Sequence, residues 1–228
     1  MKIPYNYVGI KPFPADEIRL KSGHTLFIDV RFEEQRQAQV VGEVVLLPQE
    51  LRFSTDPEKA SLEFDTDNEL QLGDTVVFNY LAATAAKKDG HILDGGVILV
   101  PYDRLYSAIR GEEIICLNGI VLVEPEQERY NTILELPQSM RKNVKCIGKV
   151  IHSGKPTRGS RSEHKVKGRT SPDMEIPKGA KVVFHWTNAI PVQPEHEMKG
   201  AITKDKMLYR MRPSDIDAIV PEGVNVTV

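Results

Sequence analysis

The chain has 228 residues, of which 40% are hydrophobic and 27% are charged. These fractions are typical of a soluble folded protein and exclude a disordered tail. A formal net charge of −2 excludes a polycation that coats nucleic acid. The first residues lack the apolar core of a signal peptide, and no run of about 18 apolar residues occurs. We therefore expect a cytoplasmic protein without a membrane segment.

Strand signals dominate the chain from one end to the other. Short runs rich in Val and Ile, bounded by Gly, Pro, Asn and Asp, are typical of β-strands. No sustained helical periodicity longer than a few turns interrupts them. In chain order the expected strands lie at 8–12, 41–45, 72–78, 95–99, 114–117, 120–123, 147–151, 178–184 and 215–220.

The same pattern occurs twice. Val41–Val45 matches Ile147–Ile151, and Leu72–Phe78 matches Lys178–Phe184, both at an offset of 106. Matches that recur in the same order predict two copies of one domain.

The two ends of the repeat have different offsets. Val8–Pro12 matches Val121–Pro125 at an offset of 113, which places a longer loop in the first copy. The closing run Leu105–Ile114 matches Leu208–Ile216 at offsets of 103 and 102, which predicts a short deletion between the copies.

An Asn-Gly pair lies at the junction of the copies. Asn118-Gly119 separates the apolar runs 114–117 and 120–123, and this dipeptide is the strongest short-range signal for a type I′ hairpin. The last strand of the first copy is then expected to pair with the first strand of the second. An ordinary linker is the alternative, although linkers are rarely this apolar. The predicted domains are residues 1–117 and 118–228.

The order of segments in each copy resembles one known family. Each copy has an opening strand that ends in proline, a long polar loop with an apolar tripeptide, a glycine-containing strand, a polar hairpin and a Gly-x-x-Val-Val-Phe strand. The chain is similar to the GroES co-chaperonin family over nearly its whole length, twice, with the closest matches at Met207–Val220 and Gln71–Asn79. The resemblance implies an all-β fold of two tandem GroES-like irregular β-barrels, joined by the tight Asn-Gly hairpin.

The resemblance also implies a binding site. In this family a mobile loop ending in a short apolar tripeptide docks on a GroEL-like chaperonin. Each apolar side chain buried in a groove contributes about 1.5–3 kcal/mol, while the ordering of a loop on binding weakens affinity and so permits release. The alternative is that these tripeptides are ordinary barrel strands. The residues in the corresponding places are Leu26, Phe27 and Ile28 in the first copy, and Ile133, Leu134 and Leu136 in the second.

Neither a catalytic site, a metal site nor a cofactor is expected. Cys116 and Cys146 lack the close spacings of a zinc site and are expected to be reduced, partly buried thiols. Gly148–Lys155 has one residue too many for a phosphate-binding loop. Asp65-Thr66-Asp67 begins like a calcium loop, but Leu70 stands where glycine is needed.

Two segments carry opposite charge. Residues 50–69 have a net charge of −5, and residues 155–169 have a net charge of +5. In one interpretation both segments are solvated loops, and the like charges within each loop keep it extended. Attraction between the two loops, screened by salt over about 10 Å, is another. Nucleic-acid binding by the basic loop is a third, less favoured interpretation because stacking aromatics are missing from that loop.

These expectations describe a non-enzymatic co-chaperonin-like lid that assists protein folding, with the ATPase residing in its partner. The alternative is a structural or scaffolding module, for example in a virus particle, that keeps the fold without binding a chaperonin. Tyr5–Lys11 and Asp215–Val220 are expected to be unpaired edge strands, which invite pairing with another chain. Because the two edges differ, the expected contact is head-to-tail and closes into a homo-oligomeric ring.

Overall fold

The chain divides into two compact units in the computed structural model. The first unit is residues 1–113 and the second is residues 114–228, whereas the sequence suggested a boundary after residue 117. The residues that the structure describes are 5–13, 17–19, 25–27, 40–54, 62, 64–127, 143–160, 175–185, 189–192, 208–221, 223 and 224.

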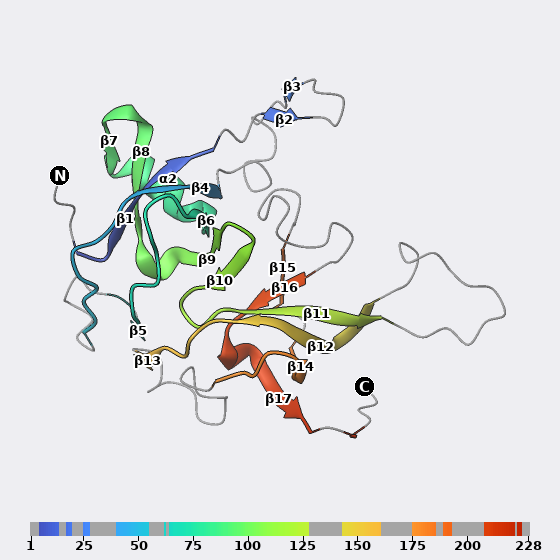
Figure 1. Cartoon of the computed structure of the whole chain (residues 1–228). Coiled ribbons are helices and arrows are strands. Elements are labelled where there is room, and N and C mark those ends of the chain that lie inside the picture. The colour runs from blue at the N-terminus through green and yellow to red at the C-terminus, as the bar shows by residue number, and fades with distance from the viewer. Residues whose placement is uncertain are drawn as a thin grey trace. The chain divides into compact units, whose positions relative to one another are not determined.

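The first unit consists mainly of strands (Figure 1). Its strands up to the division are β1 (Tyr7–Pro12), β2 (Glu17–Arg19), β3 (Thr25–Phe27), β4 (Val41–Leu46), β5 (Phe64–Asp65), β6 (Thr75–Phe78), β7 (Ile92–Leu93), β8 (Val97–Pro101) and β9 (Leu105–Arg110). It also contains the helix α2 (Tyr80–Lys88) and the 3-10 helices η1 (Asp94–Gly96) and η2 (Tyr102–Arg104). Strand β10 (Glu113–Cys116) spans the division.

The second unit repeats this composition without an α-helix among its described residues. Its elements are β11 (Val121–Gln127), β12 (Asn143–Ser153), β13 (Arg158–Ser160), β14 (Lys181–Phe184), β15 (Ile190–Val192), β16 (Leu208–Met211), η6 (Pro213–Asp215) and β17 (Ile216–Val220).

The main sheets of the two units have the same strand order. The first contains β9-β6-β4-β1-β8-β7, and the second contains β17-β14-β12-β11-β16-β15, with neighbouring strands antiparallel. The internal repeat seen in the sequence is therefore a repeat of topology. The prediction of a β-rich chain is confirmed, whereas no closed barrel is found among the described strands, so the barrels stay a prediction.

The opening strands of the two units also share their register. The pairing of β1 with β4 shifts between Gly9 and Ile10, and that of β11 with β12 shifts between Leu122 and Val123. Such a shift marks a β-bulge, which bends the strand at that point. The bulges are 113 residues apart, so the predicted offset for this segment is confirmed.

The closing strands correct the predicted alignment. Phe78 pairs with Leu105 at an irregularity in the β6–β9 ladder, and Phe184 pairs with Ile216 at the same irregularity between β14 and β17. Leu105 therefore corresponds to Ile216, at an offset of 111 rather than 103. The predicted match of Leu105 with Leu208 is wrong, because Leu208 lies in β16, the counterpart of β8.

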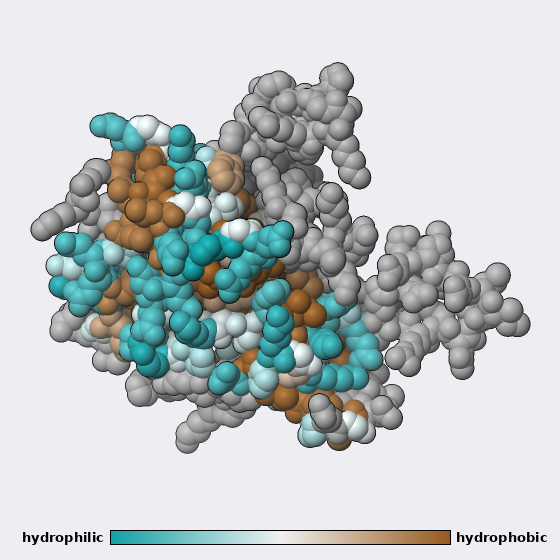
Figure 2. Space-filling model, in the orientation of Figure 1, coloured by the Kyte–Doolittle hydropathy of each residue, from teal (hydrophilic) through white to brown (hydrophobic). Residues whose placement is uncertain are grey.

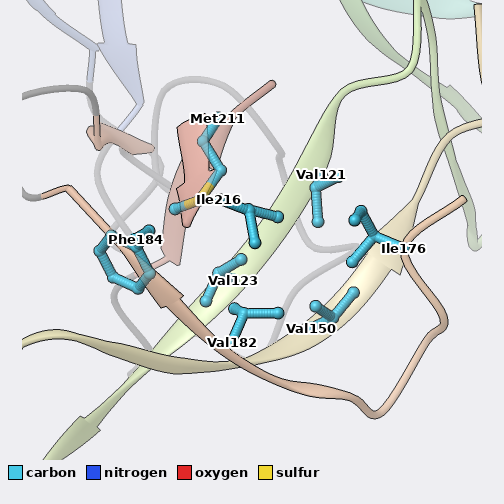
Figure 3. Close-up of a cluster of buried hydrophobic side chains, with 8 residues drawn as sticks. All are labelled: Val121, Val123, Val150, Ile176, Val182, Phe184, Met211 and Ile216. Atoms are coloured by element: carbon cyan, nitrogen blue, oxygen red, sulfur yellow. The ribbon is translucent and has the colours of Figure 1, made fainter. Parts of the chain in front are cut away.

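The cores of the two units are built from equivalent positions. In the second unit, eight buried apolar side chains pack together (Figure 3): Val121, Val123, Val150, Ile176, Val182, Phe184, Met211 and Ile216. Offsets of 113, 106 and 111 carry these positions to Val8, Ile10, Val44, Leu70, Val76, Phe78, Val100 and Leu105. All eight counterparts are buried in the first unit. Core position, as well as strand order, is thus repeated.

Helix α2 was not predicted from the sequence. Asn79 caps it by accepting a hydrogen bond from the Leu81 amide at 2.9 Å, and the small residues Ala82, Ala83 and Ala86 face inward. Ile92 and Pro191 hold equivalent ladder positions, so the chain from Phe184 to Pro191 is seven residues shorter than the chain from Phe78 to Ile92, and the offset falls from 106 to 99. The insertion that makes α2 is therefore specific to the first unit.

The junction has the predicted turn. Asn118 and Gly119 have φ of 56° and 70°, and the Ile120 amide donates to the Leu117 carbonyl at 2.9 Å. Two positive φ values with this hydrogen bond are the geometry of a type I′ turn. On its far side β11 pairs with β12 and with β16. The ladder expected between the strands that flank the turn is not confirmed.

The opening strand is not an edge. β1 lies between β4 and β8 and is hydrogen-bonded to both, so the expectation that Tyr5–Lys11 offers an unpaired edge is wrong. The sequence showed an apolar opening strand, but only the topology shows that its two sides are occupied. Head-to-tail pairing through this strand is therefore not supported. Within the described part of the chain, no helix is long and apolar enough to cross a membrane.

Candidate functional site

The segment between β1 and β4 contains a small sheet of its own. β2 pairs with β3 antiparallel, and Ile18 lies opposite Leu26 while Glu17 lies opposite Phe27. These two strands form a separate two-stranded sheet rather than part of the main sheet. The apolar tripeptide predicted to bind a chaperonin thus begins in a strand that does not belong to the body of the domain.

Two of the six predicted contact residues fall in that strand. Leu26 and Phe27 are the last two residues of β3. The other four lie outside the described residues: Ile28, Ile133, Leu134 and Leu136. The structure therefore places part of the first predicted set and leaves the second set untested.

The base of this segment is closely packed. A Cβ on Gly42 would lie 2.6 Å from Ile10 Cγ2 and 2.9 Å from Pro12 Cα, which is closer than real side chains approach. The Phe13 amide also donates to the Val41 carbonyl at 2.9 Å. Only glycine allows β4 to approach β1 so closely, and the approach holds both ends of the loop.

The second unit has the same close approach at a glycine. Gly148, the counterpart of Gly42 at an offset of 106, packs where a Cβ would collide with Val123 Cγ1 and with the Glu124 carbonyl. Val123 and Glu124 are in turn the counterparts of Ile10 and Lys11. Both predicted loops therefore leave their domain between the same pair of strands, held at the same glycine.

A polar cluster that the sequence did not reveal lies in the first unit. The guanidinium of Arg110 donates from Nε to Asp74 Oδ1 at 2.9 Å and from Nη2 to Asp74 Oδ2 at 2.7 Å. Asp74 is only 3% exposed. Its carboxylate also accepts from the Gln71 amide at 2.8 Å, and Arg110 Nη2 donates to the Glu69 carbonyl at 3.0 Å. We call Asp74, Arg110 and Tyr102 the polar cluster.

Tyr102 completes this cluster from η2. It is fully buried, and its hydroxyl donates to the Asp67 carbonyl at 3.2 Å and accepts from the Glu69 amide at 3.0 Å. Burial is the main reason that the pKa of Tyr102 is raised far above its ordinary value. The hydrogen bond to Asp74 is the main reason that the pKa of Arg110 is raised. Both side chains therefore keep their protons at any physiological pH.

The second unit has the equivalent turn without a carboxylate at the position of Asp74. In the first unit the Asp74 amide donates to the Gln71 carbonyl at 3.3 Å, and in the second the Ala180 amide donates to the Pro177 carbonyl at 3.1 Å. Pro177 has no amide hydrogen to satisfy, so the carboxylate of Asp74 has no necessary counterpart. The polar cluster thus stabilises one turn, and its Asp74 and Tyr102 side chains are buried.

The charged segments are described only in part. In the acidic segment, Glu50 pairs with Arg52 at 3.3 Å, and Arg52 lies 3.4 Å from the ring centre of Tyr5. In the basic segment, Lys155 and Arg158 are exposed, and the remaining basic residues lie outside the described part of the chain. None of the three interpretations of these charges is decided.

Cys116, Cys146 and His152 lie in the second unit, outside the polar cluster. Cys116 is buried and Cys146 is half-buried, and the two are not joined in a disulfide. The pKa of His152 is lowered, first by burial and second by the charge of Lys178. Among the described residues no three His, Cys, Asp or Glu side chains are placed to hold a metal ion.

Several apolar side chains outside the predicted loops are exposed in the first unit. Figure 2 shows apolar residues gathered over the β7–β8 region of the first unit, where Ile92 is 44% exposed. Leu72 is 64% exposed at the turn before β6, and Leu81 is 56% exposed on α2. These positions provide matched controls for substitutions in the loops.

Comparison with known proteins adds no assignment: no protein family model matches the chain, and no curated protein sequence matches it.

Proposed function

We propose that the protein is a non-enzymatic, co-chaperonin-like lid that binds a GroEL-like chaperonin through the apolar residues of its two loops. Leu26, Phe27 and Ile28 are the contacts in the first copy, and Ile133, Leu134 and Leu136 are those in the second. The partner supplies the ATPase, and the lid assists folding by closing the partner's chamber.

The observation that carries this proposal is the separation of β3 from the main sheet. An apolar strand inside the main sheet would be explained by the core alone. Among the strands that the structure describes, β3 instead pairs with β2 alone. An isolated two-stranded hairpin is marginally stable in water unless it packs against something else. Apolar residues in such a segment are best explained by a partner.

The duplication gives further support. Gly42 and Gly148 hold equivalent strands at the ends of the two predicted loops. On this proposal each copy of the fold carries one binding element. Linking two weak contacts in one chain raises the overall affinity without strengthening either contact. That arrangement suits a lid that must bind and then dissociate.

The test is a pull-down of the full chain with a chaperonin in the presence and absence of nucleotide. We expect Phe27→Ser and Leu134→Ser each to weaken capture, and both together to abolish it. Leu72→Ser is the control: it removes an exposed apolar side chain outside the loops, and Lys178 at the corresponding place shows that the turn accepts a polar residue. Capture that is absent, or that is indifferent to both loop variants, leaves the structural or scaffolding module.

A further inference from the structure

The turn at the start of the second unit is buried, although most connecting segments run over the surface of a protein. Asn118 is only 6% exposed, and Gly119 is buried as well. A Cβ on Gly119 would lie 3.5 Å from Thr157 Cγ2 and 3.6 Å from the Lys155 carbonyl oxygen. Residues 155–157 therefore pack against the turn.

Backbone hydrogen bonds also hold this turn. The Ile120 amide donates to the Leu117 carbonyl at 2.9 Å, and the Gly154 amide donates to the Ile120 carbonyl at 2.8 Å. A Cβ on Gly154 would lie 2.6 Å from the Cys116 carbonyl oxygen, so only glycine fits there. The turn can open only when these contacts break.

The dipeptide in the turn is chemically reactive. Asn118 is the only asparagine of the chain that glycine follows, and glycine has no side chain to obstruct an attack by its own nitrogen. When the Gly119 nitrogen attacks Asn118 Cγ, a bond forms between these atoms and the Cγ–Nδ2 bond breaks. The amide proton of Gly119 leaves with the amine as ammonia. Water then opens the cyclic imide to aspartate or isoaspartate.

The folded turn opposes this attack. In a type I′ turn the ψ angle of the first central residue is about +30°. This angle places the Gly119 nitrogen roughly opposite Asn118 Cβ about the Cα–C bond, whereas ring closure requires the two atoms to be eclipsed. The backbone must therefore rotate out of the turn before the ring can form.

We propose that Asn118 is a modification site that folding controls: its amide is lost by deamidation in the unfolded chain and is protected in the folded turn. Aspartate would place a charge at a buried position, which is unfavourable, and isoaspartate would lengthen the backbone of the turn. The product thus marks chains that have stayed unfolded and hinders their return to the fold. This inference does not depend on the proposed function.

Asn6 provides an internal control in the first unit. It occupies the place of Gly119 at an offset of 113, and the two residues have φ of 68° and 70°. Asn6 is also 6% exposed, and its side chain donates to the Arg52 carbonyl and accepts from the Arg52 amide. Tyr7 follows it and obstructs attack by the backbone nitrogen. We therefore expect Asn6 to stay unmodified where Asn118 reacts.

Peptide mapping by mass spectrometry tests the proposal on the full chain, incubated at neutral pH either folded or in guanidinium chloride. We expect Asn118 to deamidate at least about 100-fold more slowly in the folded protein, because reaction there requires opening of the turn. Gly119→Ala should slow the reaction in the unfolded chain. Equal rates in the two states would overturn the inference, as would an unfolded chain in which Asn118 reacts no faster than Asn6.

Two further variants test whether the packing of the turn provides the protection. Gly154→Ala places a methyl group against the Cys116 carbonyl and should speed deamidation of Asn118 in the folded protein, and Thr157→Ser should do so more weakly. Gly42→Ala is the matched control, because its collision lies in the first unit, and it should leave the rate at Asn118 unchanged. Circular dichroism checks that each variant is folded. If neither Gly154→Ala nor Thr157→Ser speeds the reaction, the turn is not what protects Asn118.

Discussion

Arg110 and Asp74 are joined by two hydrogen bonds, of 2.9 Å and 2.7 Å, between a half-exposed guanidinium and a buried carboxylate. Removing Arg110 leaves that carboxylate with a single backbone donor. We expect Arg110→Ala to lower the free energy of unfolding by about 2–4 kcal/mol, measured by urea denaturation. Arg110→Lys should cost less, because it keeps the charge but loses the two-pronged geometry. Equal stability of the Ala variant and the wild type would contradict a stabilising role for the pair.

The second unit suggests a rescue for the loss of Asp74. Asp74→Ala leaves the Gln71 amide without the acceptor that it has at 2.8 Å. Gln71→Pro removes that amide hydrogen, as Pro177 does in the equivalent turn. We expect the double variant to recover about 0.5–1 kcal/mol relative to Asp74→Ala alone. In the wild-type background Gln71→Pro should not stabilise the protein, because it removes a satisfied hydrogen bond.

Gly42 and Gly148 give a paired prediction because they make the same close approach in the two units. A methyl group at either position collides with the opposite strand, so Gly42→Ala and Gly148→Ala should each cost about 1–3 kcal/mol. Denaturant unfolding of the two variants measures this cost. The neighbouring exposed residues provide the control, and Glu43→Ala and Lys149→Ala should change stability by less than about 0.5 kcal/mol. A neutral Gly148→Ala beside a costly Gly42→Ala would contradict the equivalence of the two contacts.

The parts of the fold that could be predicted are those with local causes. The alignments of β1 with β11 and of β4 with β12 were correct. The apolar residues of these strands are buried, and close packing requires Gly42 and Gly148. The closing segment was misaligned because the dipeptides Leu105-Tyr106 and Leu208-Tyr209 are identical in sequence. They belong to strands that are not equivalent, β9 and β16. Burial beside Phe78 and Phe184, rather than residue identity, makes Leu105 and Ile216 equivalent.

The polar cluster could not be predicted because its members meet only in three dimensions. Asp74 and Arg110 are 36 residues apart, and Tyr102 contacts residues more than 30 positions away. The candidate loops were recognised by position in the repeat, whereas the isolated pairing of β2 with β3 required the topology. Helix α2 had a readable signal in Asn79, the alanine-rich run and Lys87-Lys88 at its end, although strand signals on both sides dominated.

The cap of α2 gives a prediction of its own. Asn79 accepts from the Leu81 amide at 2.9 Å, so Asn79→Ala should cost about 1 kcal/mol. Asn79→Ser and Asn79→Asp should keep most of the stability, because both side chains cap helices well. Thermal unfolding monitored by circular dichroism provides the measurement. A ranking in which Ala equals Ser and Asp would show that the cap contributes nothing.

His152 makes the stability of the second unit depend on pH. Burial and the charge of Lys178 lower the pKa of His152 in the folded state. As the pH falls, the unfolded chain therefore protonates this imidazole before the folded protein does. The unfolded state then binds more protons, and stability rises with pH in that range. Protonation of His152 does not reduce the free energy of unfolding above the ordinary histidine pKa of about 6.5. Below that value the free energy of unfolding declines as the pH falls.

Two substitutions taken from the first unit test this dependence. Leu46 occupies the place of His152, and Leu72 occupies the place of Lys178. We expect His152→Leu to flatten the stability profile between about pH 7 and pH 5, measured by urea denaturation at several pH values. Lys178→Leu should reduce the slope without removing it, because burial is the larger cause of the lowered pKa. A slope that persists unchanged in His152→Leu would assign the acid sensitivity to another group.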